Sequence, residues 1–268
     1  MRVGFIGDVV GRPGRKLIET HVRALKECYG LDGVIANGEN ASHGFGLSIK
    51  NAHELFSAGV DMLSGGNHSW DKKEIMTLMD SAPILRPVNY PKAAPGSGVG
   101  YLRTPSYTLA VVNLMGHYTM PMCNNPFLTI TEVLETLEPH DGVLIDFHAE
   151  ATSEKRALLA MLKGKVSAIV GTHTHVGTDD LSVVEGTAYV TDVGLTGCRD
   201  NVIGMDVAAP LKRFLTGLPA SFEVPNRCKG ILQMVVMEFE GSVCKEAFKL
   251  KLYDGMSEPV VLDAYYET

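Results

Sequence analysis

Residues 168–175 read Ala-Ile-Val-Gly-Thr-His-Thr-His, so a short apolar run leads directly into a polar segment that carries two histidines. A short apolar run bounded by Gly and polar residues is typical of a buried strand. Four earlier runs follow the same plan: Arg2–Ile6 before Asp8, Gly33–Ala36 before Asn37 to Asn40, Val60–Leu63 before Gly65 to His68, and Val143–Phe147 before His148. In open α/β sheets, ligands bind outside the carboxyl ends of the strands. One crevice should therefore collect all of these polar side chains.

Helical patterns separate these runs and indicate an α/β fold. Apolar residues recur at helical spacing in 13–29, and Ser48 and Gly59 fit the start and end of a helix over 48–58. We also expect helices near 72–79, 129–137, 153–162 and 206–215, a loop over 83–100, and further strands at 107–114 and 166–170. Antiparallel strands are expected at 181–184, 187–191, 221–224, 230–239 and 242–252, with turns at Glu185-Gly186 and Glu240-Gly241. The pattern predicts two stacked β-sheets flanked by helices, in one domain over residues 1–268.

Composition excludes several classes of protein. The net charge is −7, from 24 basic and 31 acidic residues, and we find no Lys/Arg run that could grip duplex nucleic acid. No apolar stretch approaches the ~20 residues of a membrane-spanning helix, and no signal peptide is recognisable at the amino terminus. The five cysteines are odd in number and lack a CxxC pair, which favours reduced thiols and argues against a disulfide framework or a thiolate zinc site. We expect a cytoplasmic homo-oligomer with no membrane partner.

The donors gathered at the strand ends suit two metal ions better than one. They are two carboxylates, two amides and four imidazoles: Asp8, Glu39, Asn40, Asn67, His68, His148, His173 and His175. Two divalent ions against two carboxylates leave about two positive charges, which suits a bridging hydroxide and a phosphate oxyanion. Glu39 lies mid-cluster in the sequence and is the candidate bridge. Without sulfur ligands, the mixture favours manganese, iron or zinc over magnesium or calcium.

His68 directly follows the candidate ligand Asn67, and two neighbouring side chains rarely reach the same ion. His68 is therefore free to act as a general acid on a departing alkoxide, with Asp71 available to hold its other nitrogen. Each residue also has a structural interpretation when taken alone. Asp8 and the two amides could simply form turns, and His148 could be a core histidine. Their convergence at five strand ends favours the metal centre.

At this point the residues resemble a known family. The order Asp8, Glu39-Asn40, Asn67-His68, His148 and His173 to His175 is similar to the calcineurin-like metallophosphoesterases, and most closely to their YmdB-like branch. The branch-specific stretches lie at 4–11 (Gly-Phe-Ile-Gly-Asp-Val-Val-Gly), 37–41 (Asn-Gly-Glu-Asn-Ala), 146–155, 191–194 and 216–219. Like the branch, this chain has Val10 where the wider superfamily has a histidine, and Glu39 where it has a bridging aspartate.

The resemblance implies a four-layer α/β/β/α sandwich with a dinuclear centre that hydrolyses small nucleotide phosphodiesters, 2′,3′-cyclic nucleotides above all. It implies that Asp8, Glu39, Asn40 and His175 hold one ion, that Glu39, Asn67, His148 and His173 hold the other, and that His68 donates a proton. Two positions depart from the branch: His117 stands where an arginine is expected and Gly177 where a glutamine is expected, both near the presumed substrate. His43 and His117 are candidate substrate contacts. The alternatives are a regulatory protein that binds a nucleotide or an RNA end with little turnover, and a phosphomonoesterase on the same site.

Overall fold

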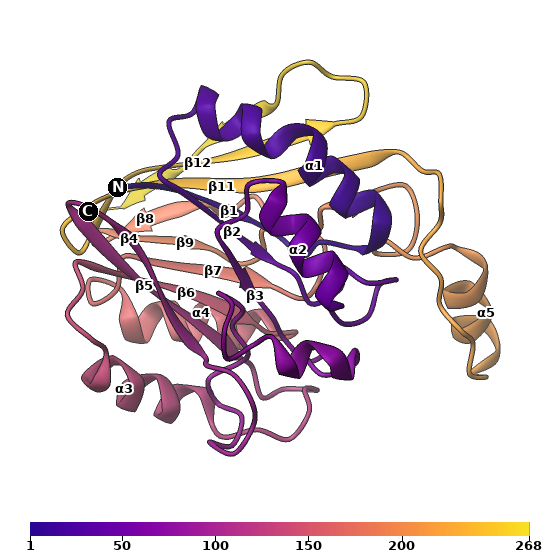
Figure 1. Cartoon of the computed structure of the whole chain (residues 1–268), viewed down its shortest axis with the longest axis horizontal. Helices are drawn as coiled ribbons and strands as arrows, with labels where there is room; N and C mark the ends of the chain where they lie inside the picture. The colour runs from indigo at the N-terminus through magenta and orange to yellow at the C-terminus, as the bar shows by residue number, and fades with distance from the viewer. Residues whose placement is uncertain (268) are drawn as a thin grey trace.

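The computed structural model describes residues 1–267 and contains two seven-stranded sheets that pack face to face (Figure 1). The spatial order of the first sheet is β13 (Val260–Asp263), β12 (Val243–Tyr253), β11 (Gly230–Glu240), β1 (Arg2–Ile6), β2 (Gly33–Asn37) and β3 (Met62–Ser64), with β10 (Gly197–Cys198) paired to β11. In this sheet β1, β2 and β3 are parallel, whereas β11, β12 and β13 are antiparallel to their neighbours.

The spatial order of the second sheet is β14 (Tyr265–Glu267), β8 (Ser182–Val184), β9 (Thr187–Val190), β7 (Ala168–Thr172), β6 (Gly142–His148), β5 (Tyr107–Met115) and β4 (Val99–Thr104). In this sheet β5, β6, β7 and β9 are mutually parallel in that order. The hairpin expected at Glu185-Gly186 joins β8 to β9 in antiparallel register, and β4 pairs antiparallel with β5.

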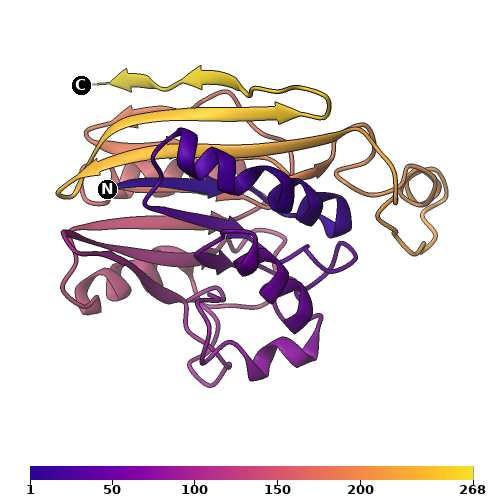
Figure 2. The ribbon, with the colours of Figure 1, turned by 45° about the horizontal axis from the view of Figure 1, so that its top comes forward.

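Helices cover the outer face of each sheet, so the molecule has the predicted four layers (Figures 1 and 2). The first sheet packs against α1 (Gly11–Cys28) and α2 (Ile49–Ser57), and the second against α3 (Pro126–Thr136) and α4 (Thr152–Leu162). In contrast, α5 (Ala208–Thr216) projects beyond the layers at one end. No helix in residues 1–267 is long and apolar enough to cross a membrane.

The alternation of side chains along the strands explains the layers. Val3 and Phe5 of β1 point into the apolar core between the sheets, where they meet Val111 and Leu144 of the second sheet. Ile6 belongs to the separate core under α1 and α2. Because successive strand residues point to opposite faces, a strand covered on both sides reads as a nearly continuous apolar run.

Four details differ from the sequence-based expectations. Residues 221–224 are irregular and do not form a strand, and the expected helix over 72–79 is only a 3-10 segment, η1 (Lys73–Thr77). The strands β4, β10, β13 and β14 were not predicted. The expectation that all cysteines are reduced is wrong in this structure, because Cys198 and Cys228 form a disulfide. An odd number of cysteines without a spacing motif gives no pairing, and only the fold brings these two Cα atoms to 5.5 Å.

Candidate metal centre

The carboxyl ends of five parallel strands meet at one edge of the two packed sheets. Strands β1, β2 and β3 come from the first sheet and β6 and β7 from the second. Asp8 follows β1, and its carbonyl accepts a hydrogen bond of 2.8 Å from Thr196 N, which fixes the backbone there. The predicted convergence is therefore observed, because side chains from five separated segments face one another.

One group of donors consists of Asp8, Asn40 and His175, all of which are buried. Nε2 of His175 lies 3.3 Å from Oδ1 of Asn40 and 3.8 Å from Oδ1 of Asp8. The amide nitrogen of Asn40 donates to Gly44 O at 3.0 Å, which directs its oxygen towards the other two donors. This group offers one nitrogen and two oxygens to a cation.

A second group consists of Glu39, Asn67, His148 and His173. Donor atoms of Glu39, His148 and His173 lie within 4.8 Å of one another. Nε2 of His148 is 3.0 Å from both Oε1 of Glu39 and Oδ1 of Asn67, and 3.1 Å from Nδ1 of His173. The seven predicted ligands therefore fall into the two groups that the family resemblance implied, with Glu39 as the proposed link between them.

Each histidine in these groups uses one ring nitrogen to bind an outer partner and directs the other nitrogen inward. His148 Nδ1 lies 2.9 Å from Thr172 Oγ1, His173 Nε2 lies 3.1 Å from Glu150 Oε2, and His175 Nδ1 lies 2.8 Å from Ile203 O. These partners assign the outer nitrogen as the N–H donor in each ring. In the neutral form of each ring the inner nitrogen then carries a lone pair, as a metal ligand requires.

The charges of the centre are strongly coupled. Burial alone would lower the pKa of His148, but Glu39, with Asp8 and Asp146, outweighs it and raises the pKa to about 9. Burial would raise the pKa of Glu39, but His148 lowers it to about 2. Burial, helped by the charge of His148, lowers the pKa of His173 to about 3, so His173 is neutral. A proton on His148 and a cation compete for the same inward nitrogen and carboxylate.

The donor set fits a divalent cation. Oε1 of Glu39 is buried and accepts no hydrogen bond from residues 1–267. A single N–H on His148 Nε2 cannot donate at the same time to the three acceptors around it, which are Glu39 Oε1, Asn67 Oδ1 and His173 Nδ1. Buried acceptors without donors are costly. A cation would satisfy these atoms together, and imidazole, amide and carboxylate ligands suit first-row transition metals.

A buried ion pair holds the segment that carries His173 and His175. Both histidines have left-handed backbone conformations, with φ of 99° and 65°. Oδ2 of Asp192 accepts hydrogen bonds from Thr174 N at 3.2 Å and Thr174 Oγ1 at 2.8 Å, and it pairs with Lys155 Nζ at 2.9 Å. Non-glycine residues persist in this region only where surrounding contacts determine the conformation. Asp192 therefore positions the two candidate ligands.

Sequence reasoning missed a polar network beneath the ligands. Asp146 is fully buried in β6 and accepts hydrogen bonds from Thr172 Oγ1 at 2.7 Å, Asn37 Nδ2 at 3.1 Å, and Ser64 Oγ. Because Thr172 also contacts His148, a carboxylate–hydroxyl–imidazole chain orients that ring. Burial raises the pKa of Asp146 to about 6. The available signal was a charged residue inside an otherwise apolar strand.

His68 lies beside the two groups and does not belong to either. Its Nδ1 is 2.8 Å from Oδ2 of Asp71, the partner expected from the sequence, and its backbone N donates to Glu39 Oε2 at 3.0 Å. The ring packs edge-on against Phe45, with centroids 5.0 Å apart. Asp71 occupies Nδ1 and leaves Nε2 available, and His68 lines a cavity of about 380 Å³ that Glu39 and His173 also line.

Three other residues singled out from the sequence lie elsewhere. His43 is exposed and borders a hollow beside Asp71 and Lys72, outside the cavity that His68 lines. His117 is also exposed, and its backbone N donates to Glu154 Oε1 at 2.8 Å. A contact of either histidine with substrate stays a prediction. A Cβ on Gly177 would meet Gln233 and Lys249, and Gly177 does not line the cavity beside His68, so its place near the substrate also stays a prediction.

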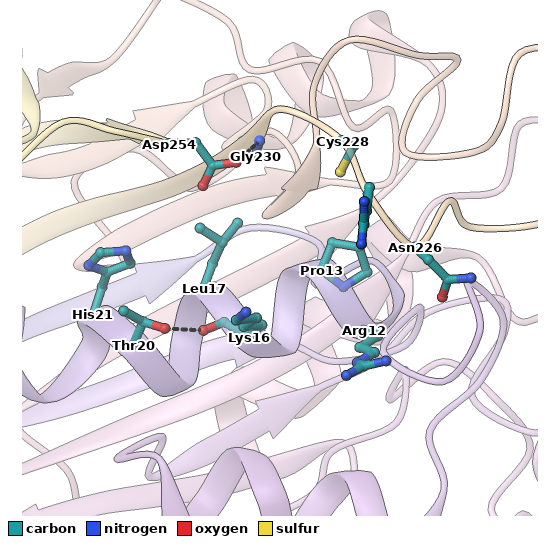
Figure 3. Close-up of a pocket in the computed structure, with 11 residues that line it drawn as sticks. Arg12, Pro13, Lys16, Leu17, Thr20, His21, Asn226, Cys228, Gly230 and Asp254 are labelled. Carbon is teal, nitrogen blue, oxygen red and sulfur yellow. Dashed lines mark hydrogen bonds between the residues drawn. The ribbon is translucent and has the colours of Figure 1, made fainter.

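A larger cavity, of about 670 Å³, lies between α1 and the start of β11 (Figure 3). Its walls carry Arg12, Lys16 and Arg227, and Asp254 binds the backbone N of Gly230 at its upper edge. It contains no group of carboxylates and imidazoles comparable with the strand-end cluster. Cavity size alone therefore does not locate the chemistry of this molecule.

Two packed sheets with carboxylate, amide and imidazole donors at their strand ends define a phosphoesterase of the metallophosphoesterase type. Comparison with known proteins agrees: the family model described as "YmdB-like protein" matches residues 5–249. The chain is 46% identical over 254 residues to a 2′,3′-cyclic-nucleotide 2′-phosphodiesterase of Bacillus subtilis (strain 168), covering 94% of this chain and 96% of that protein.

Two crystal structures share the fold closely. A hypothetical protein from Thermus thermophilus superposes with a TM-score of 0.88 at 42% identity, covering 98% of this chain and 100% of that one. A novel phosphatase from Mycoplasma pneumoniae superposes with a TM-score of 0.90 at 33% identity, covering 94% and 93%. The chain belongs to the YmdB-like family.

Proposed function

We propose that this protein is a metal-dependent phosphodiesterase that hydrolyses 2′,3′-cyclic nucleotides and holds two divalent ions, with His68 as general acid. The observation that carries the proposal is the placement of His68. The residue lines the cavity beside the ligand groups and Asp71 binds its Nδ1, and among the described residues no hydrogen bond joins the His68 ring to a proposed ligand side chain. The relative from Bacillus subtilis, named as a 2′,3′-cyclic-nucleotide 2′-phosphodiesterase, supports the substrate class.

Glu39 is proposed to contact both ions, with Asp8, Asn40 and His175 on one side and Asn67, His148 and His173 on the other. When bound, such a pair of ions activates a water molecule for attack and neutralises phosphate oxygens. Manganese, iron and zinc all suit these ligands. Elemental analysis of protein purified without added metal identifies the native one.

The chain's own residues supply the proton and its direction. Nδ1 of His68 donates a hydrogen bond to the Asp71 carboxylate, which accepts it. Nε2 of His68 is then left to deliver a proton to the departing ribose oxygen. The backbone N of His68 donates to Glu39 Oε2, so the acid and the proposed bridging carboxylate keep a fixed separation. His68 therefore increases the rate only for substrates whose leaving group is an alkoxide, because an alkoxide needs a proton to depart.

The test compares two substrates and two histidine variants in the presence of Mn²⁺. His68→Ala should lower kcat for 2′,3′-cyclic AMP by about 10²–10⁴-fold, the usual share of a general acid. It should lower turnover of bis(p-nitrophenyl) phosphate far less, because p-nitrophenolate departs without a proton. The matched control is His53→Ala, since His53 is exposed on α2.

Metal content should be unchanged in His68→Ala, and loss of metal in that variant would make His68 a ligand instead of an acid. An equal loss of rate with both substrates would also refute the acid role. Binding of the cyclic nucleotide without turnover, with any first-row metal, would favour the regulatory binder. Faster hydrolysis of monoesters than of diesters would favour the phosphomonoesterase.

A further inference from the structure

The cavity beside the metal ligands has two chemically different walls. One wall holds Glu39, Asn40, His68, His173 and His175, and it supplies the polar atoms. The opposite wall comes from the segment between the two bridged cysteines, residues 199–227, which we call the arm. The arm contributes mainly apolar side chains to the cavity: Val202, Ile203, Met205, Phe214 and Phe222, with Arg213 beside them.

A hydrogen bond connects the arm to one of the proposed metal ligands. The disulfide between Cys198 and Cys228 closes its base, and Ile203 O accepts the hydrogen bond from His175 Nδ1 at 2.8 Å. Met205 packs into an apolar cluster that also contains Phe45 and Phe222. The apolar wall therefore has a fixed position relative to the proposed ligands, although α5 projects beyond the layers (Figure 2).

Two aromatic rings of the arm line this wall. Phe222 is half-buried and lies under the guanidinium of Arg213, whose Cζ is 5.6 Å from the ring centroid. Phe214 is 82% exposed, although it lines the cavity. A cavity lined mainly by apolar and aromatic side chains, with a few polar groups on one side, is typical of a small-molecule site. A flat, apolar ligand would cover the Phe214 ring.

We infer that the arm forms the base-binding subsite of the enzyme, in which Phe214 and Phe222 pack against the nucleobase while the phosphate faces the metal ligands. This inference rests on the proposed function. The cavity volume of about 380 Å³ falls within the range of about 300–1,000 Å³ that small-molecule sites occupy. Stacking of a base on an aromatic side chain needs only the flat face of the base.

The same wall predicts weak discrimination between bases. Among the arm side chains that line the cavity, Arg213 alone carries a polar group, and that group lies over Phe222. Reading a particular base requires several directed hydrogen bonds to its edge, whereas stacking accepts every base. Purine and pyrimidine 2′,3′-cyclic nucleotides should therefore have kcat/KM values within about ten-fold of each other.

The experiment separates the base from the phosphate. The substrates are 2′,3′-cyclic AMP and the base-free methyl riboside 2′,3′-cyclic phosphate, assayed with the Mn²⁺-loaded full chain. Phe214→Ala should raise KM for 2′,3′-cyclic AMP roughly 5- to 100-fold, as loss of one stacking partner predicts, with kcat within two-fold. The base-free substrate should be unaffected, and Phe214→Trp should retain the wild-type KM. Leu215→Ala is the matched control, because Leu215 is 76% exposed on the same helix but does not line the cavity.

A second readout does not depend on turnover. Calorimetric titration of the chelated protein with adenosine should show binding that Phe214→Ala weakens and Leu215→Ala does not. If neither substrate is hydrolysed but adenosine still binds in this way, the proposed function fails and the subsite stands. Equal effects of Phe214→Ala on both substrates, no effect on either, or no binding of adenosine to the wild type would overturn the subsite. Binding of a phosphotyrosine peptide in preference to adenosine would overturn it as well.

Discussion

Replacing Lys155 by Met should destabilise the protein strongly, because it leaves a buried carboxylate without its counter-charge. The ion pair of Lys155 with Asp192 spans 2.9 Å, and each side chain is 1% exposed. Lys155 Nζ also donates to Thr172 O at 2.9 Å, so two charge-assisted hydrogen bonds are lost together. Breaking a buried pair by removing one partner costs about 3–5 kcal/mol. We expect a loss of about 3 kcal/mol, at the lower end of this range, because Thr174 and Gly194 still donate to Asp192.

The assay is urea unfolding of the chelated protein, so that metal binding does not contribute. Lys163→Met is the matched control, since Lys163 pairs with Glu185 at 2.7 Å while the two side chains are 40% and 50% exposed. An exposed pair contributes about 0–1 kcal/mol, so this variant should unfold near the wild-type midpoint. The double variant with Asp192→Leu should be more stable than the sum of the two single losses predicts, because the partners act as one unit. Equal destabilisation by the two lysine variants, or strict additivity, would refute the reasoning.

Three further predictions concern the metal centre and the arm. A Cβ on Gly66 would collide with the ring of His148 and with Glu39 Oε2, so Gly66→Ala should lose bound metal, and full metal content by elemental analysis would contradict this. Cys198→Ser should lower the free energy of unfolding by roughly 3–4 kcal/mol under oxidising conditions, the value expected for a disulfide across a separation of 30 residues. The control Cys28→Ser should leave it unchanged, because Cys28 is a free cysteine. Identical urea midpoints for the two variants would be inconsistent with a formed disulfide. In chelated protein the His148–Glu39 ion pair stabilises the fold fully between about pH 4.5 and 6.5. This stabilisation is lost as the pH rises through about 9, where His148 deprotonates, or falls through about 2, where Glu39 is protonated. The affinity for Mn²⁺ measured calorimetrically should therefore rise up to about tenfold per pH unit between about pH 6.5 and 8.5, and a constant affinity would contradict the competition with a proton.

The sequence predicted the strands that carry the ligands because both faces of those strands are covered. Residues of β1, β2, β6 and β7 are buried almost throughout, so their apolar runs are unbroken and the following polar residues stand out. The edge strand β13 is exposed along its length, and β4 is only partly buried, so neither carries a comparable pattern. Tertiary pairing alone makes these segments strands.

The candidate ligands could be proposed from their residue types and positions, but the residues that orient them could not. Asp192 lies far along the sequence from the segment that it positions, and Asp146, two residues before His148, reaches that ring only through the hydroxyl of Thr172 on β7. The arm was missed for another reason, since 221–224 has the composition of a strand but finds no neighbouring strand to pair with. Phe222 and other side chains of the arm line the cavity instead, and no local sequence pattern indicates this.

The most direct test of the central claim is a crystal structure of the Mn²⁺-loaded protein with anomalous data collected at the manganese edge. We predict two anomalous peaks about 3.5–4 Å apart, each within coordination distance of one carboxylate oxygen of Glu39. A single peak, or a pair of which only one contacts Glu39, would contradict the shared carboxylate on which the proposed mechanism depends.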